Sequence, residues 1–260
     1  MTETSTKPES SKPKIPTETV ELPSKGLVYP LENPLSSGKV EMKYMTAREE
    51  DILTNQNYIR QGVVFDKLLR SLIVSTINYD DLVIGDKNAI LIAARILGYG
   101  KDYTIKYPNP QTGEEEEVTV DLTAVKEKAV DLSLFKNLNE FSYTLPNSKN
   151  EVVFKILTHK DERIIEDELK GLKRANINSQ VTTRLKHMIL AVNGDREPKA
   201  IREFVDNYML ASDSQALRNY IKQISPDLEL KFDFHGSDGY TEEGVDLPLG
   251  LNFFYPSTGV

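Results

Sequence analysis

The sequence predicts an α+β fold that consists of two related modules, each with short strands, helices and a β-hairpin. The first observation is an alternating strand that leads through Thr46 into an acidic helix start, within residues 39–53. The same order recurs within residues 151–165, where Thr158 takes the place of Thr46. Strands alternate with a period of two and helix starts favour Thr, so the repeated pattern indicates a repeated structural unit.

The second observation is that the match resumes further along the chain. Asp86 and Asp213 each begin a helical pattern, and apolar alternation then marks strands at residues 103–107 and 230–234. The spacing between the copies is 112 residues at the two threonines and 127 at the two aspartates, a difference of 15. We therefore interpret the chain as an internal duplication with 15 residues inserted in the second copy.

The composition divides the chain into five parts. Residues 1–20 are rich in Thr, Ser, Pro, Lys and Glu and are predicted to be a disordered tail, because they bury too little apolar surface to offset the entropy of ordering. Residues 21–38 are expected to form an extended strap, since residues that precede Pro avoid the helical region. The first module then spans 39–122, a connector with helical character spans 123–139, and the second module with an inserted helix spans 140–256.

The first module begins with a half-buried strand, because Val40, Met42 and Tyr44 alternate with polar residues. Thr46 is predicted to cap the next helix. Glu49 follows three residues later, and together they form the pattern of a capping box, in which each side chain accepts the other residue's free backbone N–H.

A helical stripe of apolar residues follows at 65–73, and Asp86 is predicted to cap a third helix. Two strands then flank residues 108–113, which contain two Pro and one Gly and are expected to form a turn.

The second module follows the same plan. Thr158 and Asp213 are predicted helix caps, and residues 235–239 are the expected counterpart of the first hairpin tip. Four helices are expected near residues 159–172, 178–193, 198–209 and 214–224.

Composition restricts the classes of function. The chain has 260 residues, a net charge of −8 and no Cys, so disulfides and thiolate metal sites are excluded. No apolar run is long enough for a membrane-spanning helix, and the N-terminus lacks the apolar segment of a signal peptide. The acidic balance disfavours a general nucleic-acid role, because it repels phosphate backbones.

No catalytic motif is present, and neither a cofactor nor a metal is expected. His159, His187 and His235 lack the spacing of metal ligands and are interpreted as structural, with His159 at the surface. The carboxylates at the two acidic helix starts are favoured there by the helix dipole, which is a sufficient reason for their presence. We therefore expect a protein that is not an enzyme.

Two short segments bounded by Pro are candidates for docking to a partner, or alternatively for packing against the modules. Exposed aromatic side chains commonly dominate protein interfaces, whereas buried ones anchor a core. The candidate docking residues are Leu27, Val28, Tyr29, Phe253, Phe254 and Tyr255.

Several segments together resemble the T4-type bacteriophage baseplate protein family, which includes the hub subunit and the hub assembly chaperone. The resemblance covers roughly residues 21–256 and rests on Leu22–Gly26, Met45–Leu53, Gly85–Asn88, Gly98–Gly100 and the end from Leu247 to Pro256. It implies a virion-assembly protein that is made in the host cytoplasm, binds hub or tail proteins and has no catalytic residues. Relatives often carry Cys-x-x-Cys at the two hairpin tips, but this chain has no Cys there.

Two alternatives to a baseplate protein remain open from the residues. A nucleic-acid-associated or regulatory adaptor would use the basic side chains Lys170, Lys173, Arg174, Arg184 and Lys186. A carboxylate-dependent hydrolase would be centred on the two acidic helix starts, with Glu49 and Asp161. Neither the oligomeric state nor the particular partner follows from the sequence.

Overall fold

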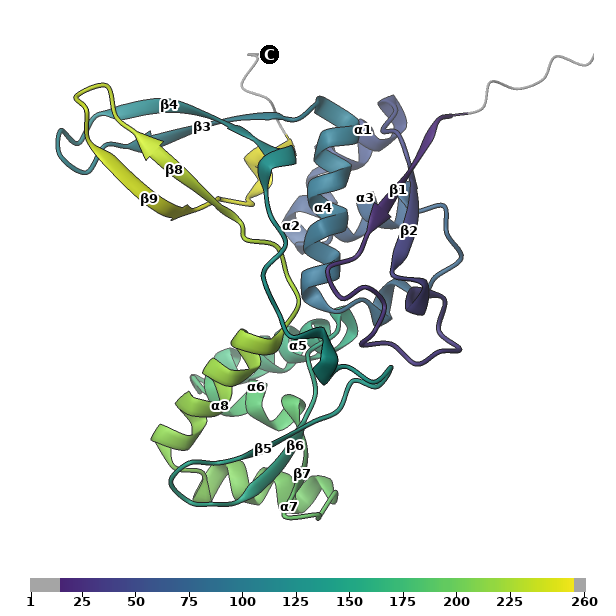
Figure 1. The fold of residues 1–260 in the computed structure, drawn as a ribbon, viewed down its shortest axis with the longest axis vertical. Helices are drawn as coiled ribbons and strands as arrows, with labels where there is room; N and C mark the ends of the chain where they lie inside the picture. Colours follow the sequence, from purple (N-terminus) through teal and green to yellow (C-terminus); the bar gives the residue numbers. More distant parts are fainter. Residues whose placement is uncertain (1–14, 255–260) are drawn as a thin grey trace, which may run out of the picture.

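The computed structural model describes residues 15–254, and the predicted α+β class is confirmed. Figure 1 shows two lobes and an arm made of two β-hairpins that lie side by side. The first lobe contains strands β1 (Thr17–Glu21) and β2 (Lys39–Lys43) and helices α1 (Ala47–Thr54), α2 (Gln56–Gln61), α3 (Val64–Leu72) and α4 (Ile84–Tyr99). The first hairpin follows, with β3 (Asp102–Pro108) and β4 (Glu115–Asp121).

The second lobe is built around a three-stranded antiparallel sheet. Its order is β5 (Phe141–Thr144), β6 (Glu151–Phe154) and β7 (Ile189–Val192). The helices are α5 (His159–Arg174), α6 (Gln180–Met188), α7 (Pro198–Glu203) and α8 (Ala211–Ile224), and the second hairpin has strands β8 (Lys231–His235) and β9 (Thr241–Asp246). Residues 189–192, which were expected to end a helix, instead pair with β6 as a strand.

Part of the predicted disordered tail forms a strand, and residues 1–14 of it lie outside the described residues. Residues from Thr17 onward form β1, which pairs antiparallel with β2 and places Val20 opposite Val40. The predicted disordered tail, 1–20, therefore includes four residues of this strand. The pairing explains the difference, because β2 offers hydrogen-bonding partners that an isolated tail lacks.

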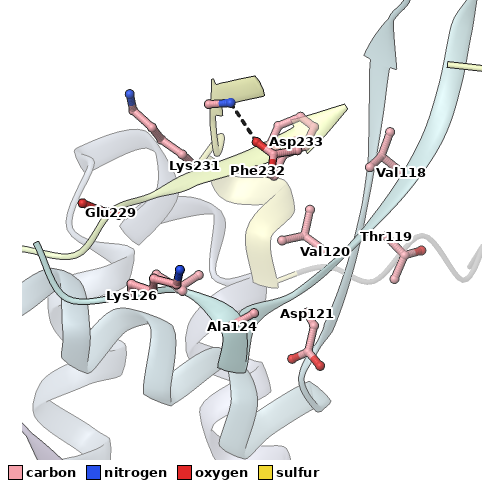
Figure 2. A pocket seen from close by; sticks show the side chains of 12 residues that line it. Val118, Thr119, Val120, Asp121, Ala124, Lys126, Glu229, Lys231, Phe232 and Asp233 are labelled. Carbon is pink, nitrogen blue, oxygen red and sulfur yellow. Dashed lines mark hydrogen bonds between the residues drawn. The ribbon is translucent and has the colours of Figure 1, made fainter. Parts of the chain in front are cut away.

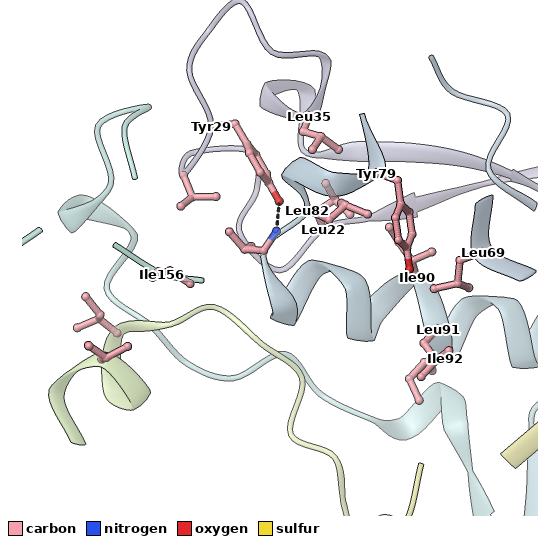
Figure 3. Close-up of a cluster of buried hydrophobic side chains, with 14 of the residues drawn as sticks. Leu22, Tyr29, Leu35, Leu69, Tyr79, Leu82, Ile90, Leu91, Ile92 and Ile156 are labelled. Carbon is pink, nitrogen blue, oxygen red and sulfur yellow. Dashed lines mark hydrogen bonds between the residues drawn. The ribbon is translucent and has the colours of Figure 1, made fainter. Parts of the chain in front are cut away.

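The strap packs against the first lobe and contributes to its core. Figure 3 shows Leu22, Tyr29 and Leu35 from the strap among side chains from α3 and α4. Gly26 permits this path, because a Cβ atom at this position would lie 2.3 Å from a backbone oxygen of Ser36.

The connector is not helical, apart from two short 3-10 turns at Leu122–Ala124 and Leu132–Leu134. Its backbone pairs instead with the segment that follows α8. The N–H of Lys128 donates to the carbonyl of Asp227 at 2.8 Å, and the N–H of Glu229 donates to that of Lys126 at 2.8 Å. These hydrogen bonds provide partners for backbone groups of the connector, so the connector does not need to form a helix to satisfy them.

Both lobes begin their first long helix with the same arrangement of polar groups. In the first lobe the Glu49 carboxylate accepts from the backbone N–H of Thr46 at 3.0 Å and from Lys43 at 2.8 Å. In the second, Asp161 accepts from Thr158 N–H at 3.0 Å and from Lys155 at 2.7 Å.

Asp86 and Asp213 do not cap their helices, because α4 and α8 each begin two residues earlier. Their carboxylates reach instead to the loop between the first two strands of each lobe. Asp86 accepts from the N–H and the Oγ of Ser24 at 2.9 and 2.6 Å. Asp213 accepts from the N–H groups of Asn147 and Ser148 at 2.8 and 2.9 Å.

The Glu49 carboxylate is expected to make the free energy of unfolding depend on pH in the acidic range. Burial raises the pKa of this carboxyl, but hydrogen bonds from Lys43, Thr46 and Ser71 together lower it from 4.5 to about 2. Because the folded pKa lies below the ordinary value, this stabilisation is complete above pH 4.5 and is lost as the pH falls towards 2. We expect Glu49→Gln to unfold with a shallower pH dependence across this interval, measured by denaturant melts at each pH. An unchanged slope would contradict the assigned ionised state.

The lobes meet at a buried polar cluster around His159, which was expected at the surface. Its Nε2 lies 3.2 Å from the Asp66 carboxylate and its Nδ1 lies 3.2 Å from the ammonium of Lys87. The ring also contacts Tyr79 edge-on, with 4.7 Å between centroids. The N–H of His159 donates to the carbonyl of Leu82 at 2.7 Å, so the start of α5 is fixed to the first lobe.

The C-terminal aromatic residues return to the first lobe and are part of its core. Phe254 is fully buried and lies 5.5 Å from the ring of Phe65. Phe253 contacts Tyr103 edge-on at 4.9 Å, and its carbonyl accepts a hydrogen bond from Arg95 at 2.8 Å. The C-terminal residues reach the first lobe because the second hairpin lies against the first hairpin, which brings the chain back to α4 (Figure 1).

Candidate docking groove between the hairpins

The arm is held together by aromatic side chains on the facing surfaces of the two hairpins. Tyr107 of β3 contacts Phe232 and Phe234 of β8, with ring centroids 5.6 and 4.9 Å apart. The hydroxyl of Tyr107 also donates to the Glu242 carboxylate at 3.1 Å. Alternation in each strand places these residues inward and leaves the other face polar.

A polar network joins the two hairpin tips. The amide of Asn109 donates to Glu116 at 2.8 Å and to Asp238 of the other hairpin at 3.1 Å. Glu116 in turn accepts from the backbone N–H of Ser237 at 2.8 Å. The hydrogen bonds from Asn109 and Ser237 lower the pKa of Glu116, which is therefore ionised at neutral pH.

A groove of about 440 Å³ lies between β4 and β8, above the point where the connector and the segment after α8 pair. Its apolar lining comes from Val118, Val120 and Phe232, and Figure 2 shows Val120 projecting from β4 towards β8. The charged lining consists of three carboxylates, Asp121, Glu229 and Asp233, and two lysines, Lys126 and Lys231. The groove is thus concave and has both apolar and polar lining residues, as is typical of binding sites.

The arm accounts for the net negative charge of the protein. Residues 101–121 and 229–246 contain twelve carboxylates and three lysines, a net charge of −9, whereas the whole chain has −8. The remaining residues therefore sum to +1. A hydrogen bond from Lys101 lowers the pKa of Asp121 to about 2, so this groove carboxylate is also ionised at neutral pH. A partner with a basic surface is the electrostatic complement of this arm.

The predicted docking residues lie elsewhere. Val28, Tyr29, Phe253 and Phe254 are buried, Leu27 is half-buried, and Tyr255 lies outside the described residues. These four side chains lie in the core, where a partner cannot reach them. Their positions therefore support packing against the modules rather than docking to a partner. No predicted cap lines the groove.

Sequence reasoning missed the groove because its two sides come from opposite halves of the chain. One signal was visible in the run of carboxylates at 114–117, although Glu side chains are usually exposed to solvent. Glu115 and Glu117 are indeed exposed, yet the charge of the arm only becomes apparent when the second hairpin is placed beside the first.

Most residues of the two alternative functions are engaged in structural contacts, whereas Lys173 and Arg174 are exposed. Glu49 and Asp161 are buried, and both accept hydrogen bonds from lysines. Of the basic residues, Arg184 binds Glu162 through both terminal nitrogens and Lys186 binds Asp206 at 2.7 Å. Within residues 15–254 no group of three or more His, Cys, Asp or Glu is arranged to hold a metal ion. In the same range no helix has the length and apolar character needed to cross a membrane.

A family model described as T4 bacteriophage base plate protein matches residues 16–234, which is most of the chain. The chain belongs to this family, and its predicted membership is confirmed. Neither the curated proteins nor the solved structures contain a match.

Proposed function

We propose that this chain is a non-enzymatic structural or assembly protein of the baseplate hub and that it acts through protein–protein contacts. The observation that supports the proposal most is the groove in the arm, since it combines an apolar lining with a net negative charge on the hairpins around it. Charge of one sign steers an oppositely charged partner and fixes its orientation, while apolar contacts supply affinity. We further propose that the protein is assembled in the host cytoplasm and is then present in the virion, which its membership of the family supports.

We also propose that the two lobes arose by duplication of one module, with boundaries near 39–122 and 140–256. The parallel contacts at Glu49 and Asp161 support this, as do those at Asp86 and Asp213. The arm then consists of one hairpin from each copy. A superposition of the lobes in which the hairpins diverge from their helices would contradict the duplication.

The function of the arm can be tested by reversing charge beside the groove. We expect the double variant Glu115→Lys and Glu117→Lys to recover about tenfold less of the other baseplate proteins from infected cells, because rim charges govern association. The recovered proteins are quantified by mass spectrometry against wild type. Formation of infectious particles by a phage that carries the variant is the second measurement.

The matched control is Glu197→Lys with Glu203→Lys, two exposed carboxylates of the second lobe that bear no ion pair among the described residues. This pair changes the net charge equally and should leave recovery unchanged. Equal losses in both double variants would indicate a general charge effect, and no loss in either would contradict the proposed role of the arm.

A further inference from the structure

The turn between α5 and α6 exposes apolar side chains of the second lobe. We define the α5–α6 tip as residues 169–181. All residues from 173 to 178 are exposed, and the side chains of Ile177 and Val181 remain 51% and 43% accessible. A second shallow cleft of about 440 Å³ is lined by Leu169, Ile177 and their neighbours. Contiguous exposed apolar surface of this kind usually marks an interaction site.

The fold itself does not require this tip. Helix α5 has 16 residues, whereas α1 at the corresponding place in the first lobe has 8. The first lobe forms its core without such an extension. The extra turns of α5 therefore expose apolar side chains that neither lobe uses for packing. Exposed apolar side chains lower solubility, so we expect a partner to cover them.

The tip is basic as well as apolar. Residues 169–181 contain Lys170, Lys173 and Arg174 and no carboxylate, so their net charge is +3. Lys170 pairs with Glu166 and Asp167, but Lys173 and Arg174 form no ion pair among the described residues. A surface with apolar residues and a net negative charge is the complement of this tip. The groove supplies the apolar lining, and its three carboxylates outnumber its two lysines within an arm of net charge −9.

We propose that the α5–α6 tip of one copy of this protein docks into the groove between β4 and β8 of a second copy. This inference rests on the proposed function of the groove as a protein-docking surface and names its occupant. Ile177 and Val181 contact the apolar lining of the groove, while Lys173 and Arg174 face the carboxylates of the arm. Because tip and groove are different surfaces, the contact is heterologous, and successive copies add head to tail to form a ring or a filament.

The expected result for the wild-type protein is reversible self-association. Sedimentation equilibrium between about 1 and about 100 μM, a range suited to a weak interface, should show an average mass that rises with concentration. High salt should lower this mass, since screening weakens the contact between exposed charges. A monomer across this whole range at low salt would overturn the proposal.

Two variants separate the two surfaces. Ile177→Asp alters the tip, and Thr119→Arg places a cation at the lining of the groove. Each should raise the dissociation constant by about tenfold or more, as expected when a central contact is lost. The control is Ile164→Asp, which changes an apolar side chain on α5 that is 41% accessible and lies outside the tip. Unchanged melting curves will show that the variants are folded, and Glu117→Lys replaces Thr119→Arg if that variant unfolds.

A mixture of the two variants gives the sharpest test. Ile177→Asp retains its groove and Thr119→Arg retains its tip, so the mixture should form a 1:1 dimer although neither variant associates alone. A symmetric tip-to-tip contact would not be restored in this way, so a mixture that stays monomeric overturns the proposal. If all proteins are monomeric while charge reversal at Glu115 and Glu117 still reduces recovery of baseplate proteins, the self-association is wrong and the proposed function stands.

Discussion

Replacing Phe254 by Ala is expected to destabilise the protein by about 3–5 kcal/mol, the usual cost of removing a buried aromatic side chain. Phe254 is fully buried, lies 5.5 Å from Phe65 and contacts Phe253 edge-on. The substitution leaves a cavity where the C-terminal segment joins the first lobe. Denaturant unfolding monitored by circular dichroism measures the change in free energy.

The matched control for this prediction is Glu115→Ala, which should be near neutral because the Glu115 side chain is exposed. Binding of the folded fraction to baseplate proteins is measured alongside stability. If Phe254→Ala leaves stability unchanged but abolishes this binding, Phe254 is a docking residue and its assignment to the core is wrong.

Replacing Asp86 by Ala is expected to cost about 3–5 kcal/mol, because it leaves several buried donors without an acceptor. The carboxylate accepts from the N–H and hydroxyl of Ser24, and from the hydroxyl of Tyr29 at 2.6 Å. The Tyr29 hydroxyl also accepts from the N–H of Val83 at 3.1 Å, which links the strap to the start of α4 (Figure 3). Loss of the carboxylate should therefore release the strap.

A double-mutant cycle with Tyr29→Phe tests this network. Since the two side chains are hydrogen-bonded, we expect a coupling free energy of about 1 kcal/mol or more between Asp86→Ala and Tyr29→Phe. Asp51→Ala, at an exposed site on α1, is the control and should be near neutral. Additive effects of the two substitutions would show that Asp86 does not hold the strap through Tyr29.

The features that could be predicted from sequence depend on residues close together in the chain. Thr46 and Glu49 are three residues apart, and so are Thr158 and Asp161, so the helix starts follow from local chemistry. Strand alternation predicted β2 and β6. The turn residues at 108–113 and 235–239 placed the two hairpin tips, because Pro and Gly disfavour a continued ladder.

Local patterns were misleading where a distant partner decides the outcome. Residues 189–192 continue a helical apolar pattern, yet they form β7 because β6 supplies backbone partners. A short apolar run suits either structure, and the contact made in the fold decides between them. His159 shows the same effect, since the groups that bury it, Asp66 and Lys87, belong to the other lobe.

The sequence alone thus determined the α+β class, the helix starts at Thr46 and Thr158, the hairpins and the resemblance to baseplate proteins. Only the tertiary structure decided that Phe253 and Phe254 pack in the core, and that hairpins from opposite halves of the chain meet to form the groove. The physical reason is distance along the chain. Arg95 binds the carbonyl of Phe253 across 158 residues, and Asn109 binds Asp238 across 129. Contacts of this range arise from the packing of whole lobes, which no short segment encodes.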